Sequence, residues 1–503
     1  MKLTDEKERF LEKGYEVYAY DRQEMIDRTR KDPEWIHFGA GNLFRMYQAM
    51  IADKLLDLGV TDKGVIVVGG TNSRNIDTYY RALDDLHIAV TLKSDGTVSK
   101  RLVGSIAESL KIEDTDRLKE IFANKSLKVV SFTITEKGYK YKKEELSDPD
   151  HSYLGRISSL LYHRYRNGAY PLTMSSQDNC SRNGDVLKAS ILAFAEGFHD
   201  PDFLSYLNEK ISFPISMIDK ITPRPDRKVA ELLKKDGLEE IDLLDPDHYL
   251  NCYANAEESE YLVIEDDFAN GRPLWDKVGV IFTDRETVAK TERMKVCTCL
   301  NPIHTALAIY GCLLDYHLIC DEMKDETLYK LVKHLGYEEG MKVVTDPGIM
   351  NPKEFLDTVL EVRLKNPFMP DAPQRIAMDT SQKLPVRFGE TLKAYLERDF
   401  DINELRYIPL VFAGWLRYLR GIDDKGNVFE LSSDPLLDRL MPLVKEYDFG
   451  NKADKEELRT LLSDSSIFGI DLIEYGMADQ VMDYFNELNE GVGAVRRTLE
   501  KYV

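Results

Sequence analysis

A lysine, a carboxamide and an imidazole follow one another closely in ERMKVCTCLNPIHTAL, residues 292–307. Clustered polar groups of these types are found at reactive sites, so Lys295, Asn301 and His304 are candidates for acid/base or hydrogen-bonding chemistry. The same residues would also suit a solvated lysine, an N-cap before Pro302 and a core histidine. On these residues alone both interpretations stay open.

A glycine turn lies near the N-terminus, in WIHFGAGNLFR at residues 35–45, which has the pattern of a strand, a tight turn and a helix. Gly39 would permit the turn, and Gly41 would let the backbone approach a pyrophosphate. The helix beginning near Asn42, with Arg45 in its first turn, would direct N–H groups at the phosphates. The third glycine of the usual fingerprint is missing, so a turn without a ligand is the alternative.

A second apolar run, Val65–Val68, ends in GGTNSR and should be the next strand of the same unit. An acidic residue at this place would bind the adenosine ribose and favour NAD. None is present, and Ser73 and Arg74 could instead meet a 2′-phosphate. The choice between NAD and NADP therefore stays open, and Arg74 could equally be an ordinary solvated arginine.

The elements that must position these residues change in character along the chain. In the first half, apolar runs such as 36–38, 65–68 and 129–135 alternate with helical patterns such as 42–58 and 116–123. This alternation predicts an α/β fold with a mainly parallel sheet that is covered on both faces. After about residue 288, amphipathic helical patterns dominate, at 302–323, 327–335, 352–365, 390–399, 405–419, 436–446 and 455–462. We therefore predict a dinucleotide-binding domain over residues 1–287 and a helical domain over residues 288–503.

Several motifs in this order resemble the polyol-specific long-chain dehydrogenases, the mannitol dehydrogenase family. The matching segments are IHFGAGNLFR (36–45), RLVGSIAESL (101–110), TITEKGY (133–139), MSSQDNCSRNGDVLK (174–188), FPISMIDKITPRP (213–225), FANGRPLWDKVGVIFTD (268–284), the Lys/Asn/His segment and QRIAMDTSQKLP (374–385). Ordered matches over most of the chain are more specific than any single motif. The resemblance implies a Rossmann-type N-terminal domain, a helical C-terminal domain, an active site in the cleft between them and no catalytic metal.

The resemblance also implies roles for particular residues. Lys295 would be the general acid/base, and Asn301 with Asn179 would hold the substrate oxygen. His304 would orient the substrate, and Glu292 would gate the proton path of the lysine. The remaining implied positions, lining the substrate or cofactor cleft, are Asp219, Arg375 and Lys383.

One departure from the family pattern concerns the spacing between Lys295 and Asn301, which is six residues here and five in the pattern. One residue is thus inserted within 296–300. On an ideal α-helix the nine residues from Lys295 to His304 turn through about 900°, which would put the two side chains on opposite faces. We therefore predict a π-bulge or a helix break between residues 296 and 301, favoured by Pro302.

Composition excludes several functions. Sixty-seven Lys and Arg against 88 Asp and Glu leave a net charge of −21, which disfavours binding to nucleic acid or to anionic lipid. No run of 18 apolar residues predicts a membrane span, and the polar N-terminus lacks the pattern of a signal peptide. The six cysteines predict reduced thiols in a cytoplasmic protein, and the spacing of Cys297, Cys299 and His304 matches no common zinc site.

The function that we expect is an NAD(P)-dependent, metal-independent oxidoreductase that interconverts a sugar acid or polyol with its keto form. Within this class we favour D-mannonate and D-fructuronate, because cationic candidates lie near the implied cleft. Mannitol 2-dehydrogenase and tagaturonate reductase activities come next. A catalytically silent sugar- or nucleotide-binding homologue is the alternative, supported by the inserted residue. The resemblance further implies a monomer.

Overall fold

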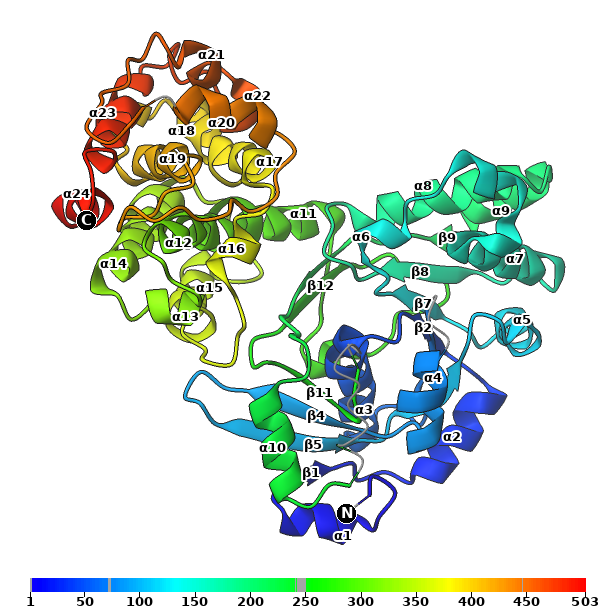
Figure 1. The fold of residues 1–503 in the computed structure, drawn as a ribbon. Helices are drawn as coiled ribbons and strands as arrows, with labels where there is room; N and C mark the ends of the chain where they lie inside the picture. Colours follow the sequence, from blue (N-terminus) through cyan, green and yellow to red (C-terminus); the bar gives the residue numbers. More distant parts are fainter. Residues whose placement is uncertain (1, 71–73, 240, 242–249, 446) are drawn as a thin grey trace. The chain divides into compact units, whose positions relative to one another are not determined.

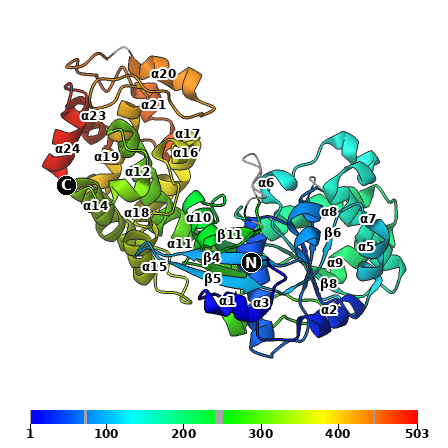
Figure 2. The same ribbon diagram turned by 60° about the horizontal axis from the view of Figure 1, so that its bottom comes forward.

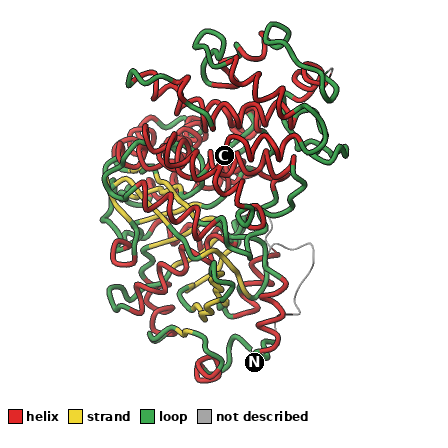
Figure 3. Tube along the Cα trace, turned by 90° about the vertical axis from the view of Figure 1, so that its left-hand side faces the viewer, coloured by secondary structure: helices red, strands yellow, loops and turns green. Residues whose placement is uncertain are grey.

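The chain folds into two compact units, Met1–Ala289 (unit 1) and Lys290–Val503 (unit 2), in a computed structural model. The structure describes residues 2–70, 74–239, 241, 250–445 and 447–503. In this part of the chain the named strands all fall in unit 1, whereas unit 2 consists of helices and loops (Figure 3). The α/β class with a helical C-terminal part is thereby confirmed.

Unit 1 is built on a six-stranded parallel sheet with the order β6-β3-β2-β7-β8-β9 (Figure 1). Its strands are β2 (Trp35–Phe38), β3 (Val65–Val68), β6 (Ile106–Leu110), β7 (Val129–Phe132), β8 (Leu172–Ser176) and β9 (Ile211–Ser212). The central strands are mostly apolar because both of their faces are buried, and polar residues among them, such as His37 and Ser131, are buried as well. Ile36, Ile66 and Val130 pack into one core, whereas Trp35, Val65 and Val129 pack into another.

The helices of unit 1 cover this sheet in the expected manner. Helices α5, α7, α8 and α9 supply the core on one face, and the helix after the glycine turn supplies the other (Figure 2). The helical segments are α1 (Lys7–Glu12), α2 (Arg22–Lys31), η1 (Phe44–Gln48), α3 (Ala49–Asp57), α4 (Arg74–Tyr79), η2 (Arg81–Leu83), α5 (Thr115–Ala123), α6 (Thr135–Gly138), η3 (Lys143–Ser147), η4 (Pro149–His151), α7 (Tyr153–Arg166), α8 (Asn183–Glu196), α9 (Pro201–Glu209), α10 (Arg227–Lys235), η6 (Trp275–Val278) and α11 (Arg285–Met294).

Two smaller sheets of unit 1 were not predicted. One has the order β1-β5-β4-β11 and the other β10-β12-β13, and both contain antiparallel pairs. Their strands are β1 (Glu16–Val17), β4 (His87–Leu92), β5 (Val98–Val103), β10 (Ser216–Asp219), β11 (Tyr253–Glu257), β12 (Tyr261–Glu265) and β13 (Ile281–Thr283). They complete the core on the face of the large sheet that helix α3 covers.

Unit 2 contains the predicted helices, several of them interrupted. Its helical segments are η7 (Lys295–Cys299), α12 (Asn301–Leu313), α13 (Ile319–Glu322), α14 (Glu326–His334), η8 (Leu335–Gly340), η9 (Met341–Val343), α15 (Pro352–Thr358), η10 (Val359–Arg363), α16 (Pro373–Ile376), α17 (Thr380–Leu384), η11 (Pro385–Gly389), α18 (Glu390–Glu397), η12 (Ile402–Glu404), α19 (Tyr407–Tyr418), α20 (Leu437–Lys445), α21 (Arg459–Leu462), α22 (Ser465–Phe468), α23 (Ala478–Leu488) and α24 (Ala494–Tyr502). The prediction of one helix over 302–323 was wrong, because the chain leaves the helix after Leu313 and Asp315 adopts a φ of 64°.

The continuous helical stretch Arg285–Leu313, formed by α11, η7 and α12, is long enough to span a membrane and contains an apolar window of 18 residues with a mean hydropathy of 1.4. However, 83% of the apolar window is buried inside the protein. Buried central helices of globular proteins have the same composition, and the burial of α12 fits that account.

The carboxyl group of Glu322 in α13 is fully buried, and neither of its oxygens has a hydrogen-bond partner among the described residues. Burial raises the pKa of Glu322 well above its usual value. The folded state therefore favours the protonated carboxyl group of Glu322. This preference stabilises the fold fully below the pKa that Glu322 has in the unfolded chain, and the stabilisation is lost as the pH rises towards the higher pKa of the folded state.

We expect Glu322→Gln to remove this pH dependence. Between pH 5 and 8, the free energy of unfolding of the wild type should fall, relative to that of the variant, by up to about 1.4 kcal/mol per pH unit. Denaturant unfolding at each pH measures the difference. Glu326→Gln, at an exposed carboxylate paired with Lys330, serves as the control. Parallel curves for wild type and Glu322→Gln would contradict the prediction.

Candidate active site

A cavity of about 550 Å³ opens in unit 1 at the carboxyl ends of β2, β3 and β7. Because β3 and β7 lie on opposite sides of β2, this is the position where the strand order reverses, which is where open parallel sheets bind ligands. The residues lining it are Gly39, Ala40, Gly41, Asn42, Leu43, Gly69, Gly70, Asn75, Thr133, Ile134, Thr135, Gly138, Tyr153, Asp178, Thr222 and Leu250. Three predicted cofactor residues, Gly39, Gly41 and Asn42, are among them.

The two glycines of the turn have different structural constraints. Gly39 has a φ of 124°, and a Cβ on it would lie 2.3 Å from the carbonyl oxygen of Thr133. Apart from its chain neighbours, a Cβ on Gly41 would have no atom of the described residues within 4 Å. The first glycine is therefore required by the fold, whereas the second leaves open space beside the backbone that fits a closely approaching pyrophosphate.

Phe44, at the position of the missing third glycine, packs below the turn. Its ring stacks on His37 with the ring centroids 4.7 Å apart. The two ring nitrogens of His37 lie 2.7 Å from Ser131 Oγ and 2.8 Å from Thr133 Oγ1. Burial lowers the pKa of His37 to about 3, so this imidazole stays neutral. The aromatic pair and its hydrogen bonds thus tie β2 to β7 directly beneath the cavity.

Two other residues predicted to bind the cofactor, Arg45 and Arg74, are not among the residues that line this cavity. Arg45 does not line the cavity, because its fully buried side chain donates to the carbonyl oxygen of Tyr253 over 3.3 Å. Arg74 is exposed at the start of α4. Ser73 lies outside the described residues.

Residues that sequence reasoning missed include Asn75, Tyr153 and Thr222, all of which line the cavity. Tyr153 donates to the carbonyl oxygen of Gly69 over 3.4 Å. Asn75 follows the second strand, close to the position where an acidic residue would bind the adenosine ribose. This position was the only feature of the sequence that could have pointed to Asn75.

Asp178 fixes the chain at the end of β7. Its carboxylate accepts hydrogen bonds from the backbone N–H groups of Ile134 and Thr135, at 2.9 and 2.8 Å, and from the hydroxyl of Tyr139. Thr135 has a φ of 66°. The prediction of a strand as far as residue 135 was therefore wrong, because the chain turns after Phe132 to meet this carboxylate.

Two further predicted residues also lie in unit 1. Asn179 follows Asp178 directly and is exposed, whereas Asp219 is buried at the end of β10. Neither lines the cavity at the ends of β2, β3 and β7.

The candidate acid/base residue, Lys295, is buried and begins a π-helical turn, η7, over Lys295–Cys299. The N–H of Leu300 donates to the carbonyl oxygen of Lys295 over 3.1 Å, five residues back. The predicted π-bulge is confirmed. Because the wide turn absorbs one residue, Lys295 and His304 are separated by about eight ordinary helical steps, which places them roughly 80° apart around the axis instead of 180°.

His304, in the first turn of α12, lies among charged side chains. Its Nε2 is 3.6 Å from Oδ2 of Asp371. Burial lowers the pKa of His304 to about 4. The negative charge of Asp371 opposes this shift, whereas the positive charges of Arg387, Arg363 and Arg375 lower the pKa further. The imidazole is therefore neutral at neutral pH and can exchange hydrogen bonds with a hydroxyl.

The two predicted cations beside it are held in place differently. Arg375 on α16 is exposed and forms an ion pair with Asp371. Lys383 on α17 donates to the backbone carbonyl oxygens of Ile376 and Met378. Burial lowers the pKa of Lys383 to about 8, with a further contribution from Arg387.

Packing within unit 2 brings these residues into one region. Turn η11 packs against η7 and α12, and α16 packs against α12. These elements carry three of the predicted residues, which are Lys295 in η7, His304 in α12 and Arg375 in α16. The fourth, Lys383, lies in α17, the helix that adjoins η11. Asn301 begins α12, and Glu292 is half-buried one turn before Lys295.

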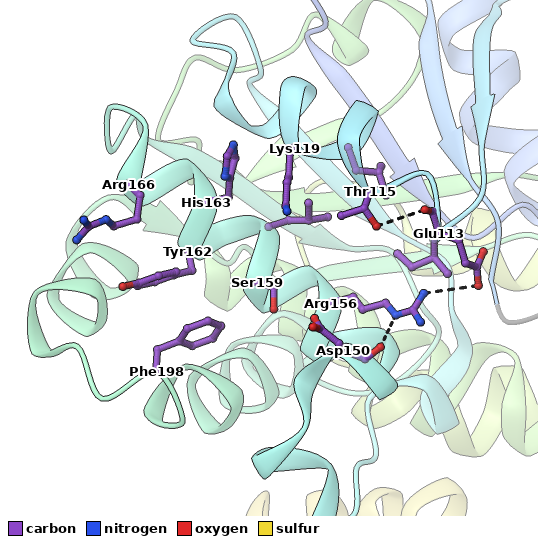
Figure 4. A pocket seen from close by; sticks show the side chains of 13 residues that line it. Glu113, Thr115, Lys119, Asp150, Arg156, Ser159, Tyr162, His163, Arg166 and Phe198 are labelled. Atoms are coloured by element: carbon purple, nitrogen blue, oxygen red, sulfur yellow. Dashed lines mark hydrogen bonds and ion pairs between the residues drawn. The ribbon is translucent and has the colours of Figure 1, made fainter.

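A second cavity of unit 1, of about 620 Å³, lies beside α5 and α7 and contains none of the predicted residues (Figure 4). Its central cation, Arg156, already donates to the carbonyl oxygen of Asp150 over 2.6 Å and pairs with Glu113 at 3.5 Å. Its chemistry therefore gives no reason to place the reaction there.

Within the described ranges, no cluster of three or more His, Cys, Asp or Glu could hold a metal ion. Cys297 and Cys299 are buried, and burial raises their pKa values to about 11 and about 12. They are therefore protonated thiols packed in the helical core.

Comparison with known families gives two matches that together span most of the chain. Residues 33–277 match the mannitol dehydrogenase Rossmann domain, and residues 287–489 match the mannitol dehydrogenase C-terminal domain.

Individual relatives agree with these matches. The D-mannonate oxidoreductase of Thermotoga maritima is 46% identical, over 96% of this chain and 95% of its own. The D-mannonate oxidoreductase of Escherichia coli is 29% identical, over 89% of this chain and 91% of its own. Pseudomonas fluorescens mannitol 2-dehydrogenase, solved with NAD and D-mannitol, superposes with a TM-score of 0.72 and 25% identity over 97% of this chain and 96% of that one.

Proposed function

Because the chain belongs to the mannitol dehydrogenase family, we propose that it is an NAD-dependent oxidoreductase that interconverts D-mannonate and D-fructuronate. Oxidoreduction of a polyol or sugar acid with NAD follows from the family and its relatives. The choice of a sugar acid is the finer step. It is supported by the similarity to the D-mannonate oxidoreductase of Thermotoga maritima and by the arginines around His304.

The observation that carries the chemistry is a buried lysine at the start of a π-turn, with a neutral imidazole in the next helix. In the direction of alcohol oxidation, Lys295 would take the hydroxyl proton, and His304 would hold a second hydroxyl. Asn301 and Asn179 would donate hydrogen bonds to the substrate oxygen as its charge changes. Glu292 would gate the proton path of Lys295. The residues that would line the substrate or cofactor site are Asp219, Arg375 and Lys383.

NAD supplies the hydride acceptor when it is bound. The residues of the cavity in unit 1 fit this group, because the space beside Gly41 admits a pyrophosphate and the helix that follows begins there. Gly39, Gly41 and Asn42 would hold it. We further propose that the protein is cytoplasmic, which its sparse cysteines support, and that it acts as a monomer, as the family resemblance implies.

A substrate panel tests the proposal. D-fructuronate, D-tagaturonate and D-fructose should each be offered with NADH and with NADPH, and the loss of reduced cofactor followed. We expect D-fructuronate with NADH to have the highest kcat/KM. Preference for D-fructose or D-tagaturonate would assign a different substrate, and no turnover of any ketose despite intact NADH binding would favour a silent homologue.

A further inference from the structure

Arg387, in turn η11, is a half-buried cation without an acidic partner among the described residues. Its Nη1 donates to the hydroxyl oxygen of Thr305 over 2.6 Å, and this neutral group is its one hydrogen-bond partner in that part of the chain. Partial burial lowers the pKa of Arg387 to about 10. A charge that is partly withdrawn from water is stabilised when an anion compensates it.

Two fully buried arginines show what a complete set of partners within the fold looks like. Arg164 donates to the backbone carbonyl oxygens of five residues, Phe122, Asn124, Leu127, Tyr170 and Pro171. Arg417 donates in the same way to the carbonyl oxygens of Ile422, Asp423 and Leu488. Arg387 has no comparable set, so its remaining N–H groups are available for a ligand.

The position of Arg387 connects it to the candidate site. Thr305 follows His304 directly, and the Thr305 hydroxyl donates in turn to the carbonyl oxygen of Asn301 over 2.8 Å. The guanidinium therefore lies one hydrogen bond from the helical turn that carries both residues. Arg375 pairs with Asp371 and Lys383 donates to two backbone carbonyls, so both of these cations are already engaged.

We infer that Arg387 binds the carboxylate of an acyclic sugar acid and thereby sets the preference for sugar acids over neutral polyols. The inference rests on the proposed function and adds a specificity-determining residue to it. A guanidinium presents two parallel N–H groups to a carboxylate, a geometry that a hydroxymethyl group cannot satisfy. A neutral polyol would leave the half-buried charge uncompensated, so the discrimination has both an attractive and a repulsive part.

The test compares Arg387→Met and Arg387→Lys with the wild type on D-fructuronate and D-fructose. For D-fructuronate we expect kcat/KM to fall by about 100-fold in Arg387→Met, mostly through KM, because a buried charge-assisted pair is lost. The fall should be smaller in Arg387→Lys, which keeps the charge but not the paired donors. With D-fructose kcat/KM should be unchanged or higher. Arg439→Met, at an exposed arginine paired with Asp464, should match the wild type on both.

A binding measurement separates this inference from the proposed reaction. Calorimetric titration of the NAD-loaded enzyme with D-mannonate and with D-mannitol needs no turnover. Binding of D-mannonate that is lost in Arg387→Met, with D-mannitol binding retained, supports the inference even if no ketose is reduced. Equal losses for acid and polyol, or unchanged D-mannonate binding, would overturn it.

Thermal unfolding without ligand tests whether Arg387 has a structural role instead of a role in binding. Since removal of an uncompensated half-buried charge is often neutral or stabilising, Arg387→Met should unfold at the same or a higher temperature than the wild type. If Arg387 instead served to hold the fold together, the variant would unfold at a lower temperature, and the acid and polyol substrates would lose activity together.

Discussion

Replacing Lys295 with alanine should lower kcat by about 10²–10⁴-fold, the usual contribution of a positioned acid or base. Lys295 is buried, so its amine is shielded from bulk water, and proton transfer from solvent cannot easily replace it. Steady-state reduction of D-fructuronate by NADH measures the effect. NADH affinity, measured by fluorescence titration, should be unchanged, because the cavity at the glycine turn does not include this residue.

Lys330→Ala provides the matched control, since it removes an exposed lysine of the same unit that is paired with Glu326. Its kcat should equal that of the wild type. If Lys295→Ala retained more than a tenth of wild-type kcat, the assignment of this lysine as the acid/base would be wrong. A parallel loss of NADH binding would instead indicate a structural role.

Replacing Gly41 with valine should weaken NADH binding by tenfold or more, about 1.4 kcal/mol or above, without changing the melting temperature. A Cβ at position 41 would have no atom of the described residues within 4 Å apart from its chain neighbours, so the fold has room for the new side chain. It would fill the space through which a pyrophosphate must approach the backbone. Fluorescence titration with NADH and thermal unfolding of the same sample give the two readouts.

Gly39→Ala gives the opposite pattern and serves as the comparison. Its Cβ would lie 2.3 Å from a backbone oxygen at a φ of 124°, so we expect a lower melting temperature. Should Gly41→Val bind NADH as tightly as the wild type, the cavity at the ends of β2, β3 and β7 would not be the dinucleotide site.

Much of the architecture could be predicted because the local patterns are strong. The run at 65–68 is apolar throughout, the run at 36–38 is apolar except for His37, and each is followed by glycine, so parallel strands buried on both faces were the natural interpretation. The π-turn could be predicted because the spacing between Lys295 and Asn301 exceeds that of the family pattern by one residue, which has to be absorbed within the helix.

The remaining features depend on contacts between distant segments. The short strands of the two smaller sheets, such as 16–17 and 281–283, carry too few residues to show a period. The stacking of Phe44 on His37 pairs residues of a helix and a strand, so the missing glycine could be noticed but not explained. Arg387 was missed because its significance lies in an unbalanced half-buried charge, and sequence does not reveal burial of an individual arginine.

The wide turn at Lys295 also determines which changes of chain length this helix can accept. Deleting any one residue from 296–300 would let the turn close with ordinary i to i−4 bonds. The eight ordinary steps from the lysine to the histidine would then turn through about 800°, which gives the same separation of roughly 80° that the wide turn already provides, so α12 would keep its direction relative to the lysine. Since all of α12 except Asn301 and His304 is buried, a residue inserted inside α12 itself would instead have to move a whole layer of the helical core. A one-codon deletion within 296–300 should therefore be far less harmful than a one-codon insertion in α12.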